Sequence, residues 1–143
     1  MTNERKKQLL ALSEKLGIDN IDLALLHQAL MHPSYAMENH TGGDNQRLEF
    51  LGDAVVDLLM GEYLYHSFPQ DDEGKLTKMR ASLVCEEALA DAATRLGLSD
   101  YLLLGHGERT SGGATRPSNL ADAWEAMCGA IYLSCGIEVL KPV

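Results

Sequence analysis

The sequence predicts an all-α protein, and two observations carry this prediction. Apolar residues recur at the 3.6-residue period of a helix along most of the chain. Short apolar alternations between paired turn residues, which are typical of β-hairpins, are almost absent. The chain has 143 residues and no internal repeat, so we expect one domain that spans residues 1–143.

Three helices are expected in the first half of the chain, over Asn3–Leu16, Asp22–Met31 and Gln46–His66. Gly17 ends the first helix as a C′ glycine. The second helix ends before Pro33, because the residue that precedes a proline avoids helical backbone angles. The segment MENHTGGDN, residues 37–45, is rich in turn residues and is expected to be a loop before the long helix. That helix stops near Pro69.

Three more helices are expected in the second half, over Lys75–Val84, Glu86–Leu96 and a last stretch that ends near Cys135. The segment QDDEG, residues 70–74, is predicted to be a turn. Residues 96–118 are rich in glycine and are expected to be broken, with short helical turns. Ser118 or Asn119 is expected to be the N-cap of the last helix.

Charge and composition limit the possible functions only loosely. Taken alone, the net charge of −9 argues against a nucleic-acid-binding protein, because phosphate contacts need Lys and Arg. No apolar run approaches the roughly 18 residues that span a bilayer, and the N-terminus lacks the features of a signal peptide. We therefore expect a cytoplasmic protein without membrane contact, in which Cys85, Cys128 and Cys135 are reduced core residues.

Two acidic pairs stand out because each lies in an apolar helical stretch. Glu49 and Asp53 are four residues apart, and Asp122 and Glu125 are three apart, so each pair shares one helix face. If the two faces meet, the four carboxylates need a cation, and an all-oxygen ligand set favours Mg²⁺ or Mn²⁺. Solvated acidic pairs remain the alternative. Spacing alone also does not separate Asp53 from Asp57, the next acid on that face.

Several motifs resemble those of the ribonuclease III family, in the same order along the chain. QRLEFLGDAVVDLL is similar to the family signature ERLEFLGDAVL, and LLHQALMHPSY resembles its LxxALTHxSY segment. DEGKLTKMRASLV resembles EGxLTxxRAxLV, while LLLGHGERTSGG and LADAWEAMCGAIYLSCG resemble LGxGExxSGG and LADxxEAxxGAxYLD. The resemblance covers about residues 6 to 140. It implies the helical fold of the ribonuclease III endonuclease domain.

The resemblance implies metal ligands at Glu49, Asp53, Asp122 and Glu125, and it excludes Asp57 from that set. We predict that Asp53 and Glu125 are catalytic residues. One position departs from the family pattern, because Gln46 stands where the family commonly has Glu. Glu73 matches a family position close to the scissile region and the RNA backbone. With it, we predict that five more residues lie close to the RNA: Gln46, Lys78, Arg80, Arg109 and Arg116.

The implied activity is Mg²⁺-dependent hydrolysis of double-stranded RNA, with Mn²⁺ able to substitute for Mg²⁺. Cleavage would leave a 5′-phosphate and a short 3′ overhang, in the processing of rRNA and mRNA precursors. The family works as a homodimer, and Phe50 matches an aromatic residue that inserts into the partner. In that arrangement Gly52 would permit a close approach of helices.

We expect the chain to be the catalytic domain alone, ending before its last helix and carrying no double-stranded-RNA-binding domain. Three alternatives remain open. One is a non-catalytic helical homodimer of the same fold that binds RNA or ribosomes, although degenerate members of that kind tend to lose the four acids. The second is an enzyme similar to Mini-ribonuclease III. The third is a Mg²⁺-dependent helical hydrolase that acts on small phosphoesters.

Overall fold

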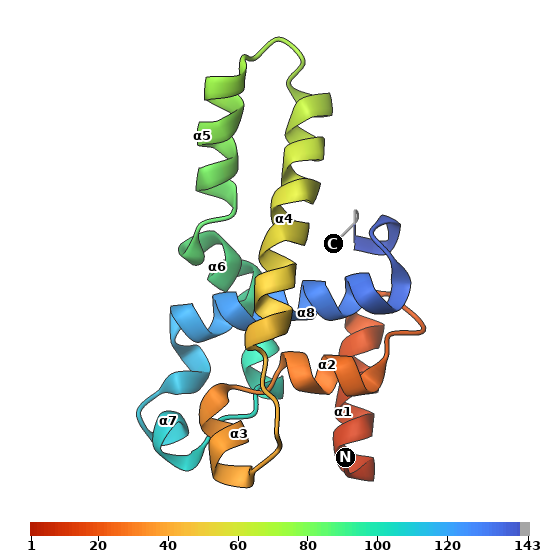
Figure 1. Cartoon of the computed structure of the whole chain (residues 1–143), viewed down its shortest axis with the longest axis vertical. Coiled ribbons are helices and arrows are strands. Elements are labelled where there is room, and N and C mark those ends of the chain that lie inside the picture. The colour runs from red at the N-terminus through yellow and green to blue at the C-terminus, as the bar shows by residue number, and fades with distance from the viewer. Residues whose placement is uncertain (141–143) are drawn as a thin grey trace.

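Two long helices, α4 (Gln46–Ser67) and α8 (Pro117–Cys135), cross near the middle of the molecule (Figure 1). A computed structural model describes residues 1–140. The other helical elements of this region are α1 (Asn3–Leu16), α2 (Leu23–Ala29), α3 (Pro33–Asn39), α5 (Glu73–Leu83), α6 (Glu86–Leu96), η1 (Leu98–Tyr101), α7 (His106–Thr110), η2 (Gly113–Thr115) and η3 (Glu138–Leu140). Within residues 1–140 no helix is long and apolar enough to cross a membrane.

Helix α8 forms the centre of the hydrophobic core. Ala123, Ala126 and Ala130 are fully buried in it, and Met127 and Ile131 fill the remaining space. Helices α2, α4 and α6 pack around α8. A helix that is apolar on most of its surface is stable only in such a central position. The small alanines allow its neighbours to come close.

Two glycines let α4 and α8 cross in direct backbone contact. A Cβ atom on Gly52 of α4 would overlap the carbonyl oxygen of Glu125 on α8. A Cβ atom on Gly129 of α8 would lie 2.6 Å from the carbonyl oxygen of Leu48 on α4. Any larger residue at Gly52 would therefore push the two backbones apart. A close helix approach at Gly52 was expected at the dimer interface, whereas the approach lies inside a single chain.

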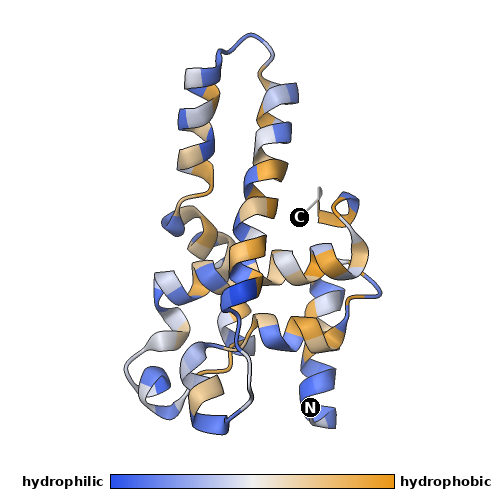
Figure 2. Cartoon of the chain, in the orientation of Figure 1, coloured by the Kyte–Doolittle hydropathy of each residue, from blue (hydrophilic) through white to orange (hydrophobic). Residues whose placement is uncertain are grey.

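Beyond the crossing, α4 continues away from α8 and pairs with α5 as a helical hairpin (Figure 1). The connection between the two helices is hydrophilic (Figure 2), as expected for a segment at the outer end of a hairpin. Asp72 caps α5, because its side chain accepts a hydrogen bond of 2.9 Å from the backbone N–H of Lys75. This cap fixes the first turn of α5, where the second helix of the hairpin begins.

Most of the expected elements are confirmed. The chain is all-α over residues 1–140, and Met31 and Leu103 form only an isolated bridge. Helices α1 and α6 have the predicted bounds, and α4 begins at the predicted residue. Gly17 takes the left-handed conformation at the end of α1, with φ of 69°.

The expected loop over residues 37–45 is partly wrong, because α3 extends through Asn39. Pro33 is the reason for this difference. A proline ends a preceding helix, but its fixed φ also suits the first turn of a new one. The side chain of His32 accepts a hydrogen bond of 3.0 Å from the backbone N–H of Ser34 and so caps α3.

The same effect moves the start of α8. The helix begins at Pro117, and neither Ser118 nor Asn119 is its N-cap. The amide of Asn119 instead donates hydrogen bonds to Glu108 and to the carbonyl of Gly113. Helix α5 also begins earlier than expected, at Glu73, within the predicted turn.

The expectation for the cysteines is correct for one residue of three. All three are free thiols, but Cys128 alone is buried. Cys85 is exposed and Cys135 is partly exposed.

We predict that Gly52→Ala lowers the free energy of unfolding by about 3 kcal/mol or more, because the methyl group meets backbone that has no room to move. Gly61→Ala, later on the same helix, is the control. Its Cβ would lie 3.5 Å from the flexible Arg80 side chain, an ordinary contact. This change should stabilise the protein by about 0.5–1 kcal/mol through helix propensity. Urea unfolding of both variants measures the effect, and equal stabilities would contradict it.

Candidate metal centre

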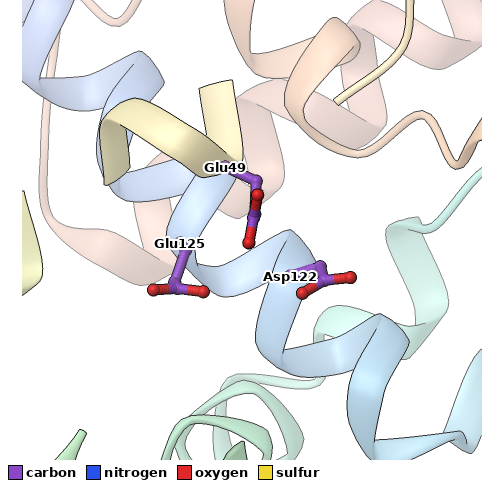
Figure 3. A group of neighbouring side chains, drawn as sticks. All are labelled: Glu49, Asp122 and Glu125. Atoms are coloured by element: carbon purple, nitrogen blue, oxygen red, sulfur yellow. The ribbon is translucent and has the colours of Figure 1, made fainter. Parts of the chain in front are cut away.

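Three carboxylates meet where α4 crosses α8. Glu49 extends from α4 toward Asp122 and Glu125, which lie one turn apart on α8 (Figure 3). One carboxylate oxygen from each residue lies within 4.8 Å of the others. The two acidic helix faces of the sequence analysis therefore face each other across the crossing. The backbone contact at Gly52 holds them there.

Asp53 is the fourth acid of this group. It lies one turn after Glu49 on α4, and its side chain is hydrogen-bonded to that of Glu125. Glu125 is only 8% exposed, whereas the side chains of Asp53 and Asp122 face solvent. The group thus has a buried inner carboxylate and more exposed outer ones, and it opens toward solvent on one side.

Burial, together with the crowding of negative charge, makes Glu125, Glu49 and Asp122 difficult to ionise. Burial raises the pKa of Glu125 to about 8, and the hydrogen bond and charge of Asp53 add to this effect, followed by the charges of Glu49 and Asp122. Burial and then the charges of Asp122 and Asp53 raise the pKa of Glu49. A bound cation would remove this penalty, because it favours the ionised carboxylates.

The available ligand atoms fit a hard divalent cation. The clustered groups supply only carboxylate oxygen atoms, which suit Mg²⁺, Ca²⁺ and Mn²⁺. Cys128 lies one turn after Glu125, but burial, and then the charge of Glu125, raises the pKa of its thiol to about 12. A protonated thiol is not a metal ligand. The residues at the crossing therefore make an oxygen-only site.

Glu86 and His32, which had no expected role in the site, influence the pKa of Asp122. Burial first and then the charge of Glu86 raise the pKa of Asp122, while His32 opposes this shift. Glu86 lies in the first turn of α6, and His32 precedes α3. Neither has a spacing relation to Asp122 in the sequence, so only the packing of the helices brings them near.

Three other residues of α4 that the sequence singled out, Asp57, Gln46 and Phe50, lie outside the carboxylate cluster. Asp57, which spacing did not separate from Asp53, is not one of the three clustered carboxylates, and unlike Asp53 it does not contribute to the pKa shift of Glu125. Gln46 is the first residue of α4 and lines an apolar groove together with Phe50. Phe50 itself is 80% exposed on a single chain.

The remaining residues predicted near RNA lie on α5 and around α7, apart from the carboxylates. Glu73 begins α5 and accepts a hydrogen bond from Thr77, at the end of the hairpin that points away from α8 (Figure 1). Lys78 is exposed on α5, and Arg80 is partly buried on the same helix.

Two arginines near α7 make internal bonds. Arg109 donates a hydrogen bond of 3.0 Å to the carbonyl of Leu102. Arg116 forms an ion pair with Glu108 and also donates to the carbonyl of Ser111. Their contact with RNA stays a prediction.

The carboxylate cluster and the helical fold agree with what comparison of the sequence finds. The family model described as Ribonuclease-III-like matches residues 22–143. The chain belongs to this ribonuclease III-like family. The resemblance to the ribonuclease III family that the sequence motifs indicated is thereby confirmed.

Curated members of the ribonuclease III-like family are similar over nearly the whole chain. A protein named Ribonuclease 3 from Moorella thermoacetica is 55% identical over 99% of this chain. One of the same name from Syntrophomonas wolfei is 51% identical over 99% of the chain. In both cases the chain spans 60% of the relative's length.

Solved structures of the family have the same fold. Two structures of the nuclease domain of ribonuclease III from Campylobacter jejuni match with TM-scores of 0.86 and 0.85. They are 46% and 44% identical to this chain. The match with the first structure covers 92% of this chain and 89% of the Campylobacter jejuni chain. The match with the second covers 99% of this chain and 90% of the Campylobacter jejuni chain. The all-α nuclease-domain fold is therefore confirmed.

We predict that the metal-free protein loses stability as the pH rises from 4.5 to about 8. In this window folded Glu125 holds a proton that the unfolded chain has released, so the folded state binds more protons and the free energy of unfolding falls with pH. Thermal unfolding in a chelator measures this slope. Mg²⁺ should raise the melting temperature most at the upper end of the window, and Glu125→Gln should flatten the slope. A stability that rises through the window would contradict the account.

Proposed function

We propose that this chain is the nuclease part of an endoribonuclease that hydrolyses phosphodiester bonds in double-stranded RNA. The convergence of Glu49, Asp53, Asp122 and Glu125 at the helix crossing supports the proposal most strongly. Curated relatives that carry the name Ribonuclease 3 support the reaction class. The expected products carry a 5′-phosphate and a short 3′ overhang, and the expected setting is precursor rRNA and mRNA processing in the cytoplasm.

The proposed cofactor is Mg²⁺, with Mn²⁺ as a substitute. Glu49, Asp122 and Glu125 would hold the ion, since their oxygen atoms come within 4.8 Å of one another, and Asp53 beside Glu125 is the fourth proposed ligand. When bound, such an ion supplies an activated water molecule and neutralises charge on the phosphate. It would also offset the burial and the neighbouring negative charges that raise the pKa of Glu125.

Asp53 and Glu125 are proposed as the catalytic pair. The two side chains are neighbours at the crossing, and in the metal-free protein the hydrogen bond and charge of Asp53 add to the burial that raises the pKa of Glu125. Glu125 is held in place by its burial, while Asp53 is exposed at the open side of the cluster. This pair is suited to take up and release a proton beside a phosphodiester, while the buried partner fixes the position of the other.

The acidic surface requires that cations outside the cluster bind the RNA. Lys78 and Arg80 on α5 are the proposed contacts, with Arg109, Arg116, Gln46 and Glu73 as further residues close to the RNA. Double-stranded RNA is recognised by its shape, its phosphates and its 2′-hydroxyl groups. A few well-placed cations can therefore provide binding without base-specific contacts.

A homodimer is proposed because α4 presents a second apolar face to solvent. Phe50, Ala54, Leu58 and Tyr65 follow one another along this face, and all four are exposed. Phe50 lies beside an apolar groove lined by Leu25, Leu48, Leu51 and Leu133, among others. An aromatic side chain beside an apolar groove is self-complementary under two-fold symmetry. One of the Campylobacter jejuni structures concerns a region involved in dimer formation of that nuclease domain.

We predict that Asp53→Asn and Glu125→Gln each reduce cleavage of long double-stranded RNA by more than about 100-fold, because each removes a carboxylate that holds the ion or moves the proton. Asp57→Asn is the matched control, one turn further along α4 and outside the cluster. It should leave the rate within about twofold. Gel-based cleavage at low salt, with Mg²⁺ or with a chelator, measures the rates.

The same assay separates the proposal from a non-catalytic protein that only binds RNA or ribosomes. A parent protein that binds the duplex but cleaves nothing in Mg²⁺ would favour the binding protein. Equal cleavage by the parent and by both cluster variants would overturn the assigned residues.

We predict that Phe50→Ala weakens the homodimer by at least about tenfold, because a central buried aromatic residue carries a large share of interface energy. Met37→Ala is the control, since Met37 on α3 is also 80% exposed but does not line the groove. Sedimentation velocity over a dilution series measures both. A monomeric parent protein, or equal effects of the two changes, would contradict the proposed interface.

A further inference from the structure

Arg5 is a buried cation without an acidic partner. The residue is 8% exposed and lies in the first turns of α1. Its guanidinium donates three hydrogen bonds, to Nδ1 of His27 at 3.1 Å, to Oε1 of Gln8 at 3.0 Å and to the carbonyl of Tyr101 at 2.8 Å. All three acceptors are neutral. None of the ion pairs formed by residues 1–140 includes Arg5.

A buried charge of this kind is unfavourable unless an opposite charge comes close. Burial lowers the pKa of Arg5, in agreement with its incomplete solvation. A guanidinium has five N–H groups, so two remain after the three bonds to the protein. Each guanidinium nitrogen therefore has one protein partner, and the two remaining N–H groups are free to bond to a ligand.

An open pocket of about 670 Å³ lies beside the guanidinium, at the N-terminal end of α1 and away from the α4–α5 hairpin (Figure 1). Its lining is rich in donors. Gln8 offers its amide NH₂, while Thr2 and Tyr35 offer hydroxyl groups. One acid, Glu4, also lines the pocket, but it is exposed and forms no ion pair with Arg5.

His27 completes the set of donors. Its Nδ1 accepts the bond from Arg5, so the neutral ring carries its proton on Nε2 and donates there. Burial, then the charge of Arg5 and then that of the Met1 amino group, lowers the pKa of His27, which keeps the ring neutral. A pocket that contains one fixed positive charge and several donors suits a ligand with negative charge and several acceptors.

We propose that the pocket formed by Arg5, Gln8, His27 and Tyr35 binds a phosphate group. A phosphate has the negative charge that Arg5 lacks and enough acceptor oxygens for the surrounding donors. The site shares no residue with the carboxylate cluster. The group comes either from a small phosphate-bearing molecule or from an RNA backbone; the second source rests on the proposed function, and the first does not.

The test titrates inorganic phosphate into the protein while NMR follows the Nε–H signal of Arg5 and the ring signals of His27. Sodium chloride at equal ionic strength corrects for salt. We expect saturable shifts at both residues. Absence of saturable shifts in the parent protein would overturn the proposal and leave Arg5 as a structural link between α1, α2 and η1.

Three variants sharpen the test. Arg5→Gln should weaken phosphate binding by about tenfold or more, because it removes a charged hydrogen-bond donor. Tyr35→Phe keeps the ring and the bonds of Arg5, and should weaken binding severalfold even if Arg5→Gln does not fold. Lys6→Gln removes an exposed charge next to Arg5 and should change nothing. Equal binding by Tyr35→Phe and the parent, or equal losses in Tyr35→Phe and Lys6→Gln, would overturn the site.

A second arm identifies the source of the phosphate. The affinity for a short RNA duplex is measured in a chelator for the parent and for Tyr35→Phe. A parallel loss of duplex and phosphate affinity supports an RNA phosphate at the site. A loss of phosphate affinity alone supports a small phosphate-bearing ligand. Failure of the proposed nuclease function would appear in the cleavage assay and would leave the phosphate titration unaffected.

Discussion

The backbone contact between α4 and α8 is the constraint on which the rest of the molecule depends. Gly52 meets the carbonyl of Glu125, and Gly129 meets that of Leu48, so the two helices cross closer than side chains would otherwise permit. Glu49 and Asp122 lie within one turn of these contacts. The distance between the two backbones therefore sets the distance between the two acidic pairs. The α4–α8 contact at the centre of the core therefore also positions the carboxylate cluster.

Without a bound cation, the carboxylate cluster lowers the stability of the folded protein. Glu125 is buried beside Asp53 and Glu49, and the pKa of Glu125 rises to about 8 as a result. A protein selected for stability alone would place apolar residues at such a crossing. The buried, alanine-rich core along α8 offsets this cost and holds the two helices together. Electrostatic destabilisation of this kind is expected where a fold positions carboxylates for a cation.

Sequence predicted the helices well because their signals are local. Periodicity, Gly17 and the spacing of each acidic pair are properties of single segments. The errors have local causes too: Pro33 and Pro117 each begin a helix, a role that the sequence analysis did not assign to either proline.

Sequence did not determine how the segments meet. Spacing left Asp57 beside Asp53 as a candidate, and family resemblance rather than geometry removed it. The partner of Gly52 was placed in a second chain, although it lies on α8 of the same chain. The unpaired charge of Arg5 gave no signal in the sequence, because it depends on three neutral acceptors brought together from α1, α2 and η1. Such features exist only after packing.

The central claim is that the crossing of α4 and α8 holds a divalent cation. Anomalous diffraction from crystals grown with Mn²⁺ tests it most directly, because the peak locates the ion without reference to activity. The account predicts a peak among the carboxylates of Glu49, Asp122 and Glu125. A peak elsewhere, or none at this crossing when all three carboxylates are ordered, would contradict it.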